Sequence, residues 1–489
     1  MVNEDTEGFV DEQQFWTELR EIVTTKCTTH EAIDDTLRSF VGFATRYKQE
    51  HLLSEYDIAK CCYSLLDAPV FRQNEEYVRR QLLFCVLQED DVDTLHLAAA
   101  LLLFDGRANE STFEMMQTES AFPRLVELVR ERRDDDLMLH RLLLELLFAM
   151  SRIQRLAKED LTTVDDAFIL YLFQLIEHVS DDADDPYHYP VIKVLLILNE
   201  QYMVLASTSS SPKPDQTLTN RILKVLSMHG PSYRTFGENL ILLLNRESAL
   251  GPQLLILKLL YLLFTTASTY EYFYTNDLHV LVDVIIRNLL DLEPGLSHAH
   301  ATAEDMDRDG QRALRHTYLR VLCPLLKNTQ LAREGNNYKR DEVRKLLRLL
   351  VNRSSAHFAP VDDTVLRLAV RCKDIEWIQD ENSEQDQEMD RRLAEIAPSE
   401  KDVANKLLGI SLQNANESSL SVVDLSAKVT KEKPTVPAPR RNRRKKHDSS
   451  TSSLKSNGAG QAGLTVPLSQ SPTEIERQRS PFADDTEEP

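Results

Sequence analysis

Glycine is scarce in this chain, at 13 of 489 residues. Most α/β enzymes use more glycine, because tight turns and phosphate-binding loops require it. No Walker loop, G-x-S-x-G motif or H-E-x-x-H motif occurs. The run Gly458–Gly460 lies in a polar C-terminal region and is not a phosphate loop. We therefore expect a protein that is not an enzyme and that has no cofactor.

Metal-ligand motifs are also missing. The six cysteines are scattered and form no C-x-x-C pair, so we expect buried thiols in a reducing compartment rather than a zinc site. The segment Asp305–Gly310 (DMDRDG) begins like a calcium loop, but its twelfth position, which needs a glutamate, is His316. We expect this segment to be a solvated acidic loop ahead of a helix from about residue 309. The sequence predicts no metal site.

Long hydrophobic runs and an excess of positive charge are absent as well. The N-terminus is acidic and has no apolar core, unlike a signal peptide. The most apolar run, Leu254–Phe264, is interrupted by Lys258 and is too short to span a bilayer. The net charge of −21 disfavours nucleic acid and anionic membranes and suits a basic partner surface. We expect a soluble cytoplasmic protein with no transmembrane segment and no nucleic-acid partner.

Helical periodicity is what the sequence does contain, from about residue 11 to about residue 378. Leucine is abundant, and no segment alternates as a strand would. Helices are expected at 12–25, 31–47, 54–66, 75–88, 92–104, 121–132, 136–151, 165–179, 188–205, 217–228, 235–246, 252–268, 277–291, 309–327, 339–351 and 361–373.

Two of these helices, at 136–151 and 252–268, are apolar almost all round. Helices of this kind suit a stack in which each pair packs on the pair before and after it. The helix at 277–291 has one broad apolar stripe, formed by Leu278, Leu281, Val282, Ile285 and Leu289. The predicted fold class is all-α: an armadillo- or HEAT-like α-solenoid of irregular helix pairs.

Local signals predict where some helices begin and what precedes them. Thr235 and Glu238 have the spacing of a capping box, and Asn276 is expected to cap the helix at 277–291. In that helix Asp283 and Arg287 are four residues apart, the spacing of an exposed ion pair. The preceding aromatic cluster, Tyr270–Tyr274, is expected to close one helical layer while the helix braces the next.

The composition changes after about residue 411. Residues 415–489 contain one aromatic residue, Phe482. They carry 12 Lys and Arg against 10 Asp and Glu, so the rest of the chain has a net charge of −23. Such a segment cannot bury enough apolar surface to fold alone. We expect a disordered N-terminus (1–10), a helical leucine-rich domain (11–378), a charged linker (379–414) and a disordered proline-containing basic tail (415–489). Within the linker, 386–412 fits either an amphipathic helix or the last turns of the solenoid.

The tail carries three short signals. Lys431, Pro434 and Pro437 have the spacing of a ligand for an SH3 domain, which reads prolines three apart on one face of a polyproline II helix; a chance match in a Pro-rich tail is the alternative. The basic run Arg440–Lys446 could flank that ligand, contact anionic lipid, resemble a nuclear signal or be a solvated charge run. Ser471 and Ser480, each before a proline, are candidate phosphorylation sites.

A family resemblance rests on five segments: FGENLILLLNRE, LLILKLLYLLFTT, YEYFYTNDLHVLVDVIIRNLLDLEPG, ALRHTYLRVLCPLL and YKRDEVRKLLRLL. With them the sequence resembles the leucine-rich domain of the SPIN-ninety/Ldb-seventeen family. The resemblance is most specific over about residues 236–350 and extends back to about Phe15. It implies an armadillo-like protein that binds and activates the Arp two/three complex without a preformed mother filament, producing linear filaments that seed branched networks. Fungal members act at cortical actin patches in endocytosis.

Two departures bear on the mechanism that the resemblance implies. The chain ends FADDTEEP, acidic but without the tryptophan of WASP-type activators, because Trp16 and Trp377 both lie in the helical region. An N-terminal SH3 domain, which animal relatives carry, is missing, so the fungal-type layout fits better. The expected partners are the Arp two/three complex, actin indirectly, and SH3-domain proteins through the tail.

The family supplies no short motif that marks the interface. We expect the exposed polar residues in and near the helix at 277–291 to contact the partner: Asp283, Arg287, Arg315, Arg320 and Lys339. The alternative function is a passive scaffold, whose solenoid and SH3 ligand bring endocytic proteins together without nucleation.

Overall fold

The computed structural model describes residues 11–133, 136–180, 185–208, 218–292, 303–333, 335–351 and 363–379, together with 387 and 391; for residues 303–309 only the backbone is described. The regular structure of this part of the chain is helical. The α-helices are α1 (Glu12–Thr24), α2 (His30–Arg46), α3 (Lys48–His51), α4 (Glu55–Leu66), α5 (Pro69–Arg72), α6 (Glu75–Gln88), α7 (Val92–Ala108), α8 (Ser111–Thr118), α9 (Ala121–Glu131), α10 (Leu137–Ile153), α11 (Lys158–Thr163), α12 (Asp166–Glu177), α13 (Tyr189–Thr208), α14 (Arg221–His229), α15 (Arg234–Arg246), α16 (Leu250–Thr265), α17 (Thr275–Asp291), α18 (Ala303–Asn328), α19 (Arg340–Val351) and α20 (Asp363–Lys373).

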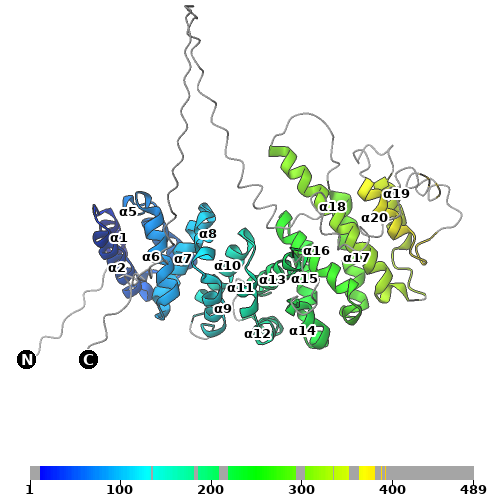
Figure 1. Ribbon diagram of the computed structural model, residues 1–489, viewed down its shortest axis with the longest axis horizontal. Coiled ribbons are helices and arrows are strands. Elements are labelled where there is room, and N and C mark those ends of the chain that lie inside the picture. Colours follow the sequence, from blue (N-terminus) through cyan, green and yellow to red (C-terminus); the bar gives the residue numbers. More distant parts are fainter. Residues whose placement is uncertain are drawn as a thin grey trace, which may run out of the picture.

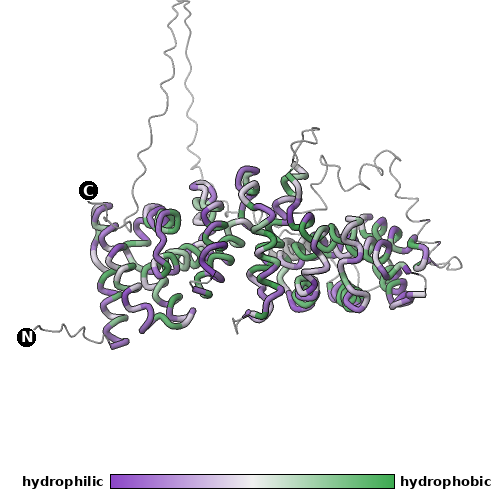
Figure 2. Tube along the Cα trace, turned by 90° about the horizontal axis from the view of Figure 1, so that it is seen from below, coloured by the Kyte–Doolittle hydropathy of each residue, from purple (hydrophilic) through white to green (hydrophobic). Residues whose placement is uncertain are grey.

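A row of helices forms the spine of the molecule. Helices α4, α7, α10, α13, α16, α18 and α20 pack one on the next, in chain order, along the long axis (Figure 1). A second row covers part of this spine: α12 packs on α13, α14 and α15, α15 packs on α17, and α17 packs on α18 and α19. The hydrophobic stretches gather in the interior of the stack (Figure 2). The predicted all-α solenoid is therefore confirmed.

The spine helices are apolar on most sides because they have neighbours on most sides. Helix α16 packs on α13, α15 and α18, and leucines on several of its faces are fully buried. Its one charged residue, Lys258, is paired with Glu200 of α13 at 2.9 Å, and Glu200 is 1% exposed. A buried charge is tolerated when it is paired in this way. The lysine that interrupts the apolar run thus joins two spine helices.

One described helix, α13, is long and apolar enough to cross a membrane by length and composition alone. Two-thirds of its most apolar window is buried inside the stack. That burial is what a spine helix between α10, α12, α14 and α16 requires.

The sixteen segments that periodicity predicts all appear as helices, most with ends shifted by one to three residues. Four further helices, α3, α5, α8 and α11, have four to eight residues each. Segments this short complete at most two turns, so they carry too few apolar positions to show a 3.6-residue period. The largest boundary difference is at α18, which begins at Ala303 and not near 309. Asp305–Gly310 is consequently helical, and the expected acidic loop is wrong.

Both predicted side-chain caps are also wrong. Helix α15 begins at Arg234, ahead of Thr235, and Thr235 instead donates through its backbone N–H and its hydroxyl to Glu177 of α12, at 3.0 and 2.7 Å. Helix α17 begins at Thr275, so Asn276 lies inside it. Asp277 lies in the first turn, where an acid complements the helix dipole, and accepts a hydrogen bond from the backbone N–H of Tyr274 at 3.3 Å.

The aromatic cluster before α17 packs against α15. Tyr272 and Phe273 are buried, whereas Tyr274 is exposed. A Cβ atom on Gly237 of α15 would lie 3.0 Å from the Tyr272 ring and 3.1 Å from the Phe273 ring. Glycine at this position therefore allows the two rings to approach the helix backbone, which holds α15 and α17 close together.

Candidate partner-binding surface

An open groove of about 450 Å³ lies between α15 and α17. Its apolar lining comes from Ile241 and Leu242 on α15 and from Val280 and Val284 on α17. Val280 is 52% exposed, which is unusual for an aliphatic side chain in a row of buried ones, whereas Ile241 and Val284 are buried. An apolar strip open to solvent between two rigid helices is typical of a surface that receives another protein.

The rim of the groove is polar and mainly acidic. Glu238 on α15 and Asp277 and Asp283 on α17 line it, together with Asn245 and Arg287. Three carboxylates and one guanidinium leave the rim with a net negative charge. This balance suits a partner segment that presents apolar side chains flanked by basic ones.

The helix pair and the segment before α19 hold the rim residues in place. Asp283 accepts a hydrogen bond from the Tyr338 hydroxyl at 3.0 Å and pairs with the Lys339 ammonium at 2.8 Å. Arg287 donates to Asn245 across the groove at 2.7 Å. The Asp283 carboxylate raises the pKa of Lys339. Asp283 and Arg287 do not pair with each other, so the expected ion pair between them is wrong. Each ties α17 to a different neighbour.

The structure brings together three of the five residues that the sequence suggests for partner contact. Asp283 and Arg287 line the groove, and Lys339 is bound to its rim. Arg315 instead donates to the carbonyl oxygen of Leu292, just after α17, at 3.3 Å. Arg320 is part-buried on α18, where burial lowers the pKa of its guanidinium.

The residues predicted in the tail lie outside the described residues. These are Lys431, Pro434, Pro437, Ser471, Ser480 and the run 440–446, and they stay predictions. The same holds for the predicted N-terminal segment 1–10 and the tail 415–489.

The α15 half of the groove was not predicted from the sequence. Glu238 and Asn245 are seven residues apart, so they lie on one face of α15, with Leu242 between them. This polar pair at two-turn spacing, on either side of an apolar residue, is a usable signal. It does not say which helix faces it, and that information comes only from the packing of α15 on α17.

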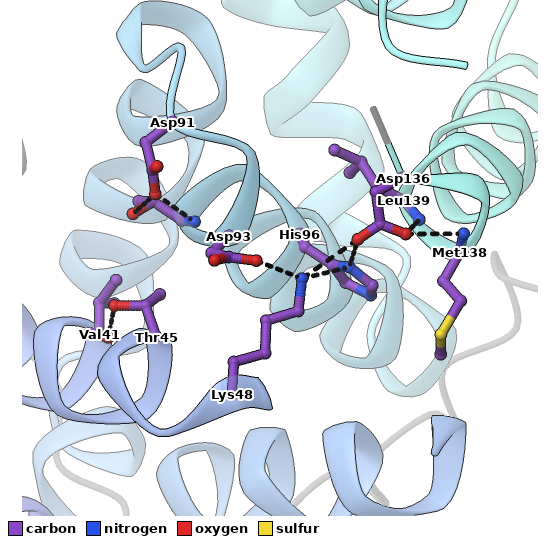
Figure 3. A network of polar contacts seen from close by, with 10 residues as sticks. Val41, Thr45, Lys48, Asp91, Asp93, His96, Asp136, Met138 and Leu139 are labelled. Carbon is purple, nitrogen blue, oxygen red and sulfur yellow. Dashed lines mark hydrogen bonds and ion pairs between the residues drawn. The ribbon is translucent and has the colours of Figure 1, made fainter. Parts of the chain in front are cut away.

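A second polar cluster lies inside the N-terminal half (Figure 3). The Lys48 ammonium in α3 is 2.7 Å from Asp93 of α7 and 3.1 Å from Asp136, the residue before α10. It is also 3.0 Å from Nδ1 of His96, which in turn is 2.9 Å from Asp136. The other oxygen of Asp136 accepts from the backbone N–H groups of Met138 and Leu139 and so caps α10.

This cluster holds helices together and has no room for a ligand. Lys48 and His96 are 8% and 3% exposed, and the adjoining cavity is about 10 Å³, the lower limit for one water molecule. Among the described residues no three His, Cys, Asp or Glu side chains are placed to hold a metal ion. His96 is a hydrogen-bonded core histidine.

The Asp136 carboxylate makes the stability of this cluster depend on pH. Burial alone would raise its pKa, but the hydrogen bonds from His96 and Leu139 and the charge of Lys48 hold the pKa well below 3.8. A carboxyl whose pKa is depressed on folding stabilises fully above its unfolded pKa and loses that effect as the pH falls through the folded value. The contribution of Asp136 is therefore complete above about pH 4.

We expect Asp136→Asn to lower the free energy of unfolding by about 2 kcal/mol at pH 7, because it removes a charge-assisted contact while an amide still caps α10. The difference from the unmodified protein should shrink steadily as the pH falls from 4 towards 2. Urea unfolding at pH 7, 5 and 3 measures it. A difference that stays constant over this range would contradict the role given to the Asp136 charge.

Comparison with known proteins places the groove inside a recognised domain. Residues 184–343 match the SPIN90/Ldb17 leucine-rich domain, and this range includes the whole groove and Lys339. Protein dip1 of Schizosaccharomyces pombe is 28% identical over 375 residues, which are 76% of this chain and 95% of that protein. Protein LDB17 of Saccharomyces cerevisiae is 37% identical over 211 residues, which are 42% of this chain and 38% of that protein. Protein LDB17 of Eremothecium gossypii is 26% identical over 393 residues, which are 73% of this chain and 80% of that protein.

Proposed function

Because this chain belongs to the SPIN90/Ldb17 family, we propose that it binds and activates the Arp two/three complex without a preformed mother filament. The resulting linear filaments would seed branched networks in cortical actin patches during endocytosis, in the cytoplasm. The observation that carries the proposal is the domain match over residues 184–343, which coincides with the part of the stack that opens into the groove.

The groove is the surface that we assign to the complex. A nucleation activator has to hold a large partner in one arrangement, and interlocked helices supply a rigid surface for this. Its apolar strip supplies area to bury, and its acidic rim selects a partner surface with basic side chains. The contacts of Asp283 with Tyr338 and Lys339 fix the rim before the partner arrives, which lowers the entropy cost of binding.

A passive adaptor is the second candidate, favoured by the SH3-ligand spacing in the tail. Assembly of pyrene-labelled actin with purified Arp two/three complex, and without preformed filaments, separates the two functions. An activator shortens the lag in proportion to its concentration. If the protein binds the complex but leaves the lag unchanged at saturation, the adaptor function is correct.

The tail is proposed to recruit SH3-domain proteins through Lys431, Pro434 and Pro437. Changing both prolines to alanine should abolish pull-down by the cognate SH3 domain, because its groove reads prolines on one polyproline II face. Nucleation by the purified protein should not change, since these residues lie outside the matched domain. The measurement is a paired pull-down and actin-assembly experiment.

Neutralising the basic run 440–446 is the control for that prediction. If charge alone recruits the tail, this change should weaken binding in a salt-dependent way while the proline variant still binds. That outcome would show that the proline spacing is accidental. Ser471 and Ser480 are proposed as phosphorylation sites that add negative charge to the same tail.

A further inference from the structure

Two cysteines on different helices face each other near the C-terminal end of the described stack. Cys323 lies on α18 and Cys372 on α20, and these helices pack directly together. The Cys323 sulfur is 3.8 Å from the carbonyl oxygen of Arg371, the residue before Cys372. The Cys372 sulfur is 3.8 Å from the carbonyl oxygen of Leu319, one turn before Cys323. Each sulfur therefore lies against the backbone of the helix that carries the other cysteine.

The surroundings of the two sulfurs shift their pKa values in opposite directions. The neighbouring Cys372 thiol, with the positive charges of Arg371 and Lys327, lowers the pKa of Cys323. The neighbouring Cys323 thiol and complete burial raise the pKa of Cys372. Cys323 is thus the thiol of the pair that ionises more readily, and the thiolate is the form that attacks oxidants. Its exposure is 9%, whereas Cys372 is fully buried behind it.

The other cysteines lack this combination. Burial raises the pKa of Cys61 to about 12 and that of its neighbour Cys62 as well. Burial also raises the pKa of Cys85. Cys27 is part-buried, and its sulfur lies 3.2 Å from the hydroxyl of Thr36. Buried thiols with raised pKa values behave as small apolar side chains rather than as nucleophiles.

We propose that Cys323 and Cys372 are a peroxide-sensitive pair that forms an intramolecular disulfide between α18 and α20. The Cys323 thiolate attacks one oxygen of a hydroperoxide; the O–O bond breaks, the sulfur becomes a sulfenic acid and the other oxygen leaves as water or an alcohol. The Cys372 sulfur then attacks the sulfenic sulfur, forming the S–S bond and releasing water. The two thiols supply the two electrons that reduce the peroxide, and a dithiol reductant reverses the reaction.

The bond would close a loop that contains α19 and would fasten the last spine helix to the rest of the stack. Because such a link restricts the unfolded chain, it should raise the melting temperature, by about 2–5 °C for a domain of this size.

The test treats the full-length protein with hydrogen peroxide and maps its peptides by mass spectrometry without reduction. We expect a peptide linked through Cys323 and Cys372, a mass lower by two hydrogens and the stated rise in melting temperature, all reversed by dithiothreitol. In Cys372→Ser, a sulfenic-acid probe should label Cys323, whereas in Cys323→Ser the linked peptide should be absent.

Cys85→Ser is the matched control and should link as the unmodified protein does. Two results would overturn the proposal. One is oxidation of the unmodified protein that leaves both thiols free while other cysteines react. The other is a link between Cys323 and a second molecule in place of Cys372. The readout on the unmodified protein does not depend on whether any variant folds.

Discussion

Replacing Asp105 with alanine is expected to lower the free energy of unfolding by about 3–5 kcal/mol, because a buried guanidinium loses its buried counter-charge. Asp105 on α7 accepts two hydrogen bonds from Arg79 of α6, at 2.6 and 3.0 Å, and a third from the Thr112 hydroxyl on α8. Arg79 and Asp105 are 6% and 5% exposed. The pair therefore joins three consecutive helices inside the stack.

Urea unfolding measures the effect, and two further variants control it. Glu75→Gln removes the exposed partner of Arg79, 3.1 Å away, and should cost less than about 1 kcal/mol, as surface ion pairs usually do. The double variant Arg79→Met with Asp105→Leu removes both charges and should recover much of the loss. An Asp105→Ala protein whose free energy of unfolding lies within 1 kcal/mol of that of the unmodified protein would contradict this prediction. It would show that water or a movement of the side chain solvates the Arg79 guanidinium.

Replacing Val280 with aspartate is expected to weaken binding of the Arp two/three complex about 30-fold, equivalent to about 2 kcal/mol, and to lengthen the lag of actin assembly accordingly. Val280 is the exposed aliphatic residue of the groove. A carboxylate there would be desolvated under an apolar partner segment and would add a like charge to the acidic rim. The stability of the protein should change by no more than about 0.5 kcal/mol, as for other surface substitutions.

Leu290→Asp is the matched control. Leu290 lies on the same helix, is 45% exposed and does not line the groove. The same change there should leave binding and activation intact. If both variants bind as the unmodified protein does, the complex uses another surface. If both fail while their melting temperatures stay normal, the contact covers the whole of α17 and not the groove alone.

The periodicity of the sequence predicts where the helices lie but not which side chains of other helices they contact. Periodicity located α10 and α16 correctly because each is long and apolar, and a helix buried on most sides leaves that pattern in any packing. Periodicity also placed Ile285 in the apolar stripe of α17, and Ile285 is fully buried. It could not show that Lys258 is neutralised, because Glu200 lies 58 residues earlier in the chain.

The predictions that were wrong or incomplete failed because the deciding contacts come from other helices. Thr235 has the sequence of a capping residue, but a carboxylate from α12, 58 residues away, binds its backbone N–H and its hydroxyl. Asp283 and Arg287 have the spacing of an ion pair, yet partners outside α17 offer both side chains better contacts. A groove is a property of two helices, so the sequence could suggest its α17 half through polar residues but not the half supplied by α15.

The central claim is that this chain starts new filaments with the Arp two/three complex and needs no older filament. Imaging of single fluorescent filaments tests it most directly, in a mixture of actin monomers, purified complex and this protein, with no preformed filaments and no WASP-type activator. We predict linear filaments whose number rises with the protein concentration and falls with Val280→Asp but not with Leu290→Asp. Filament numbers no higher than with actin and complex alone, or new filaments that appear only as branches on added filaments, would contradict the account.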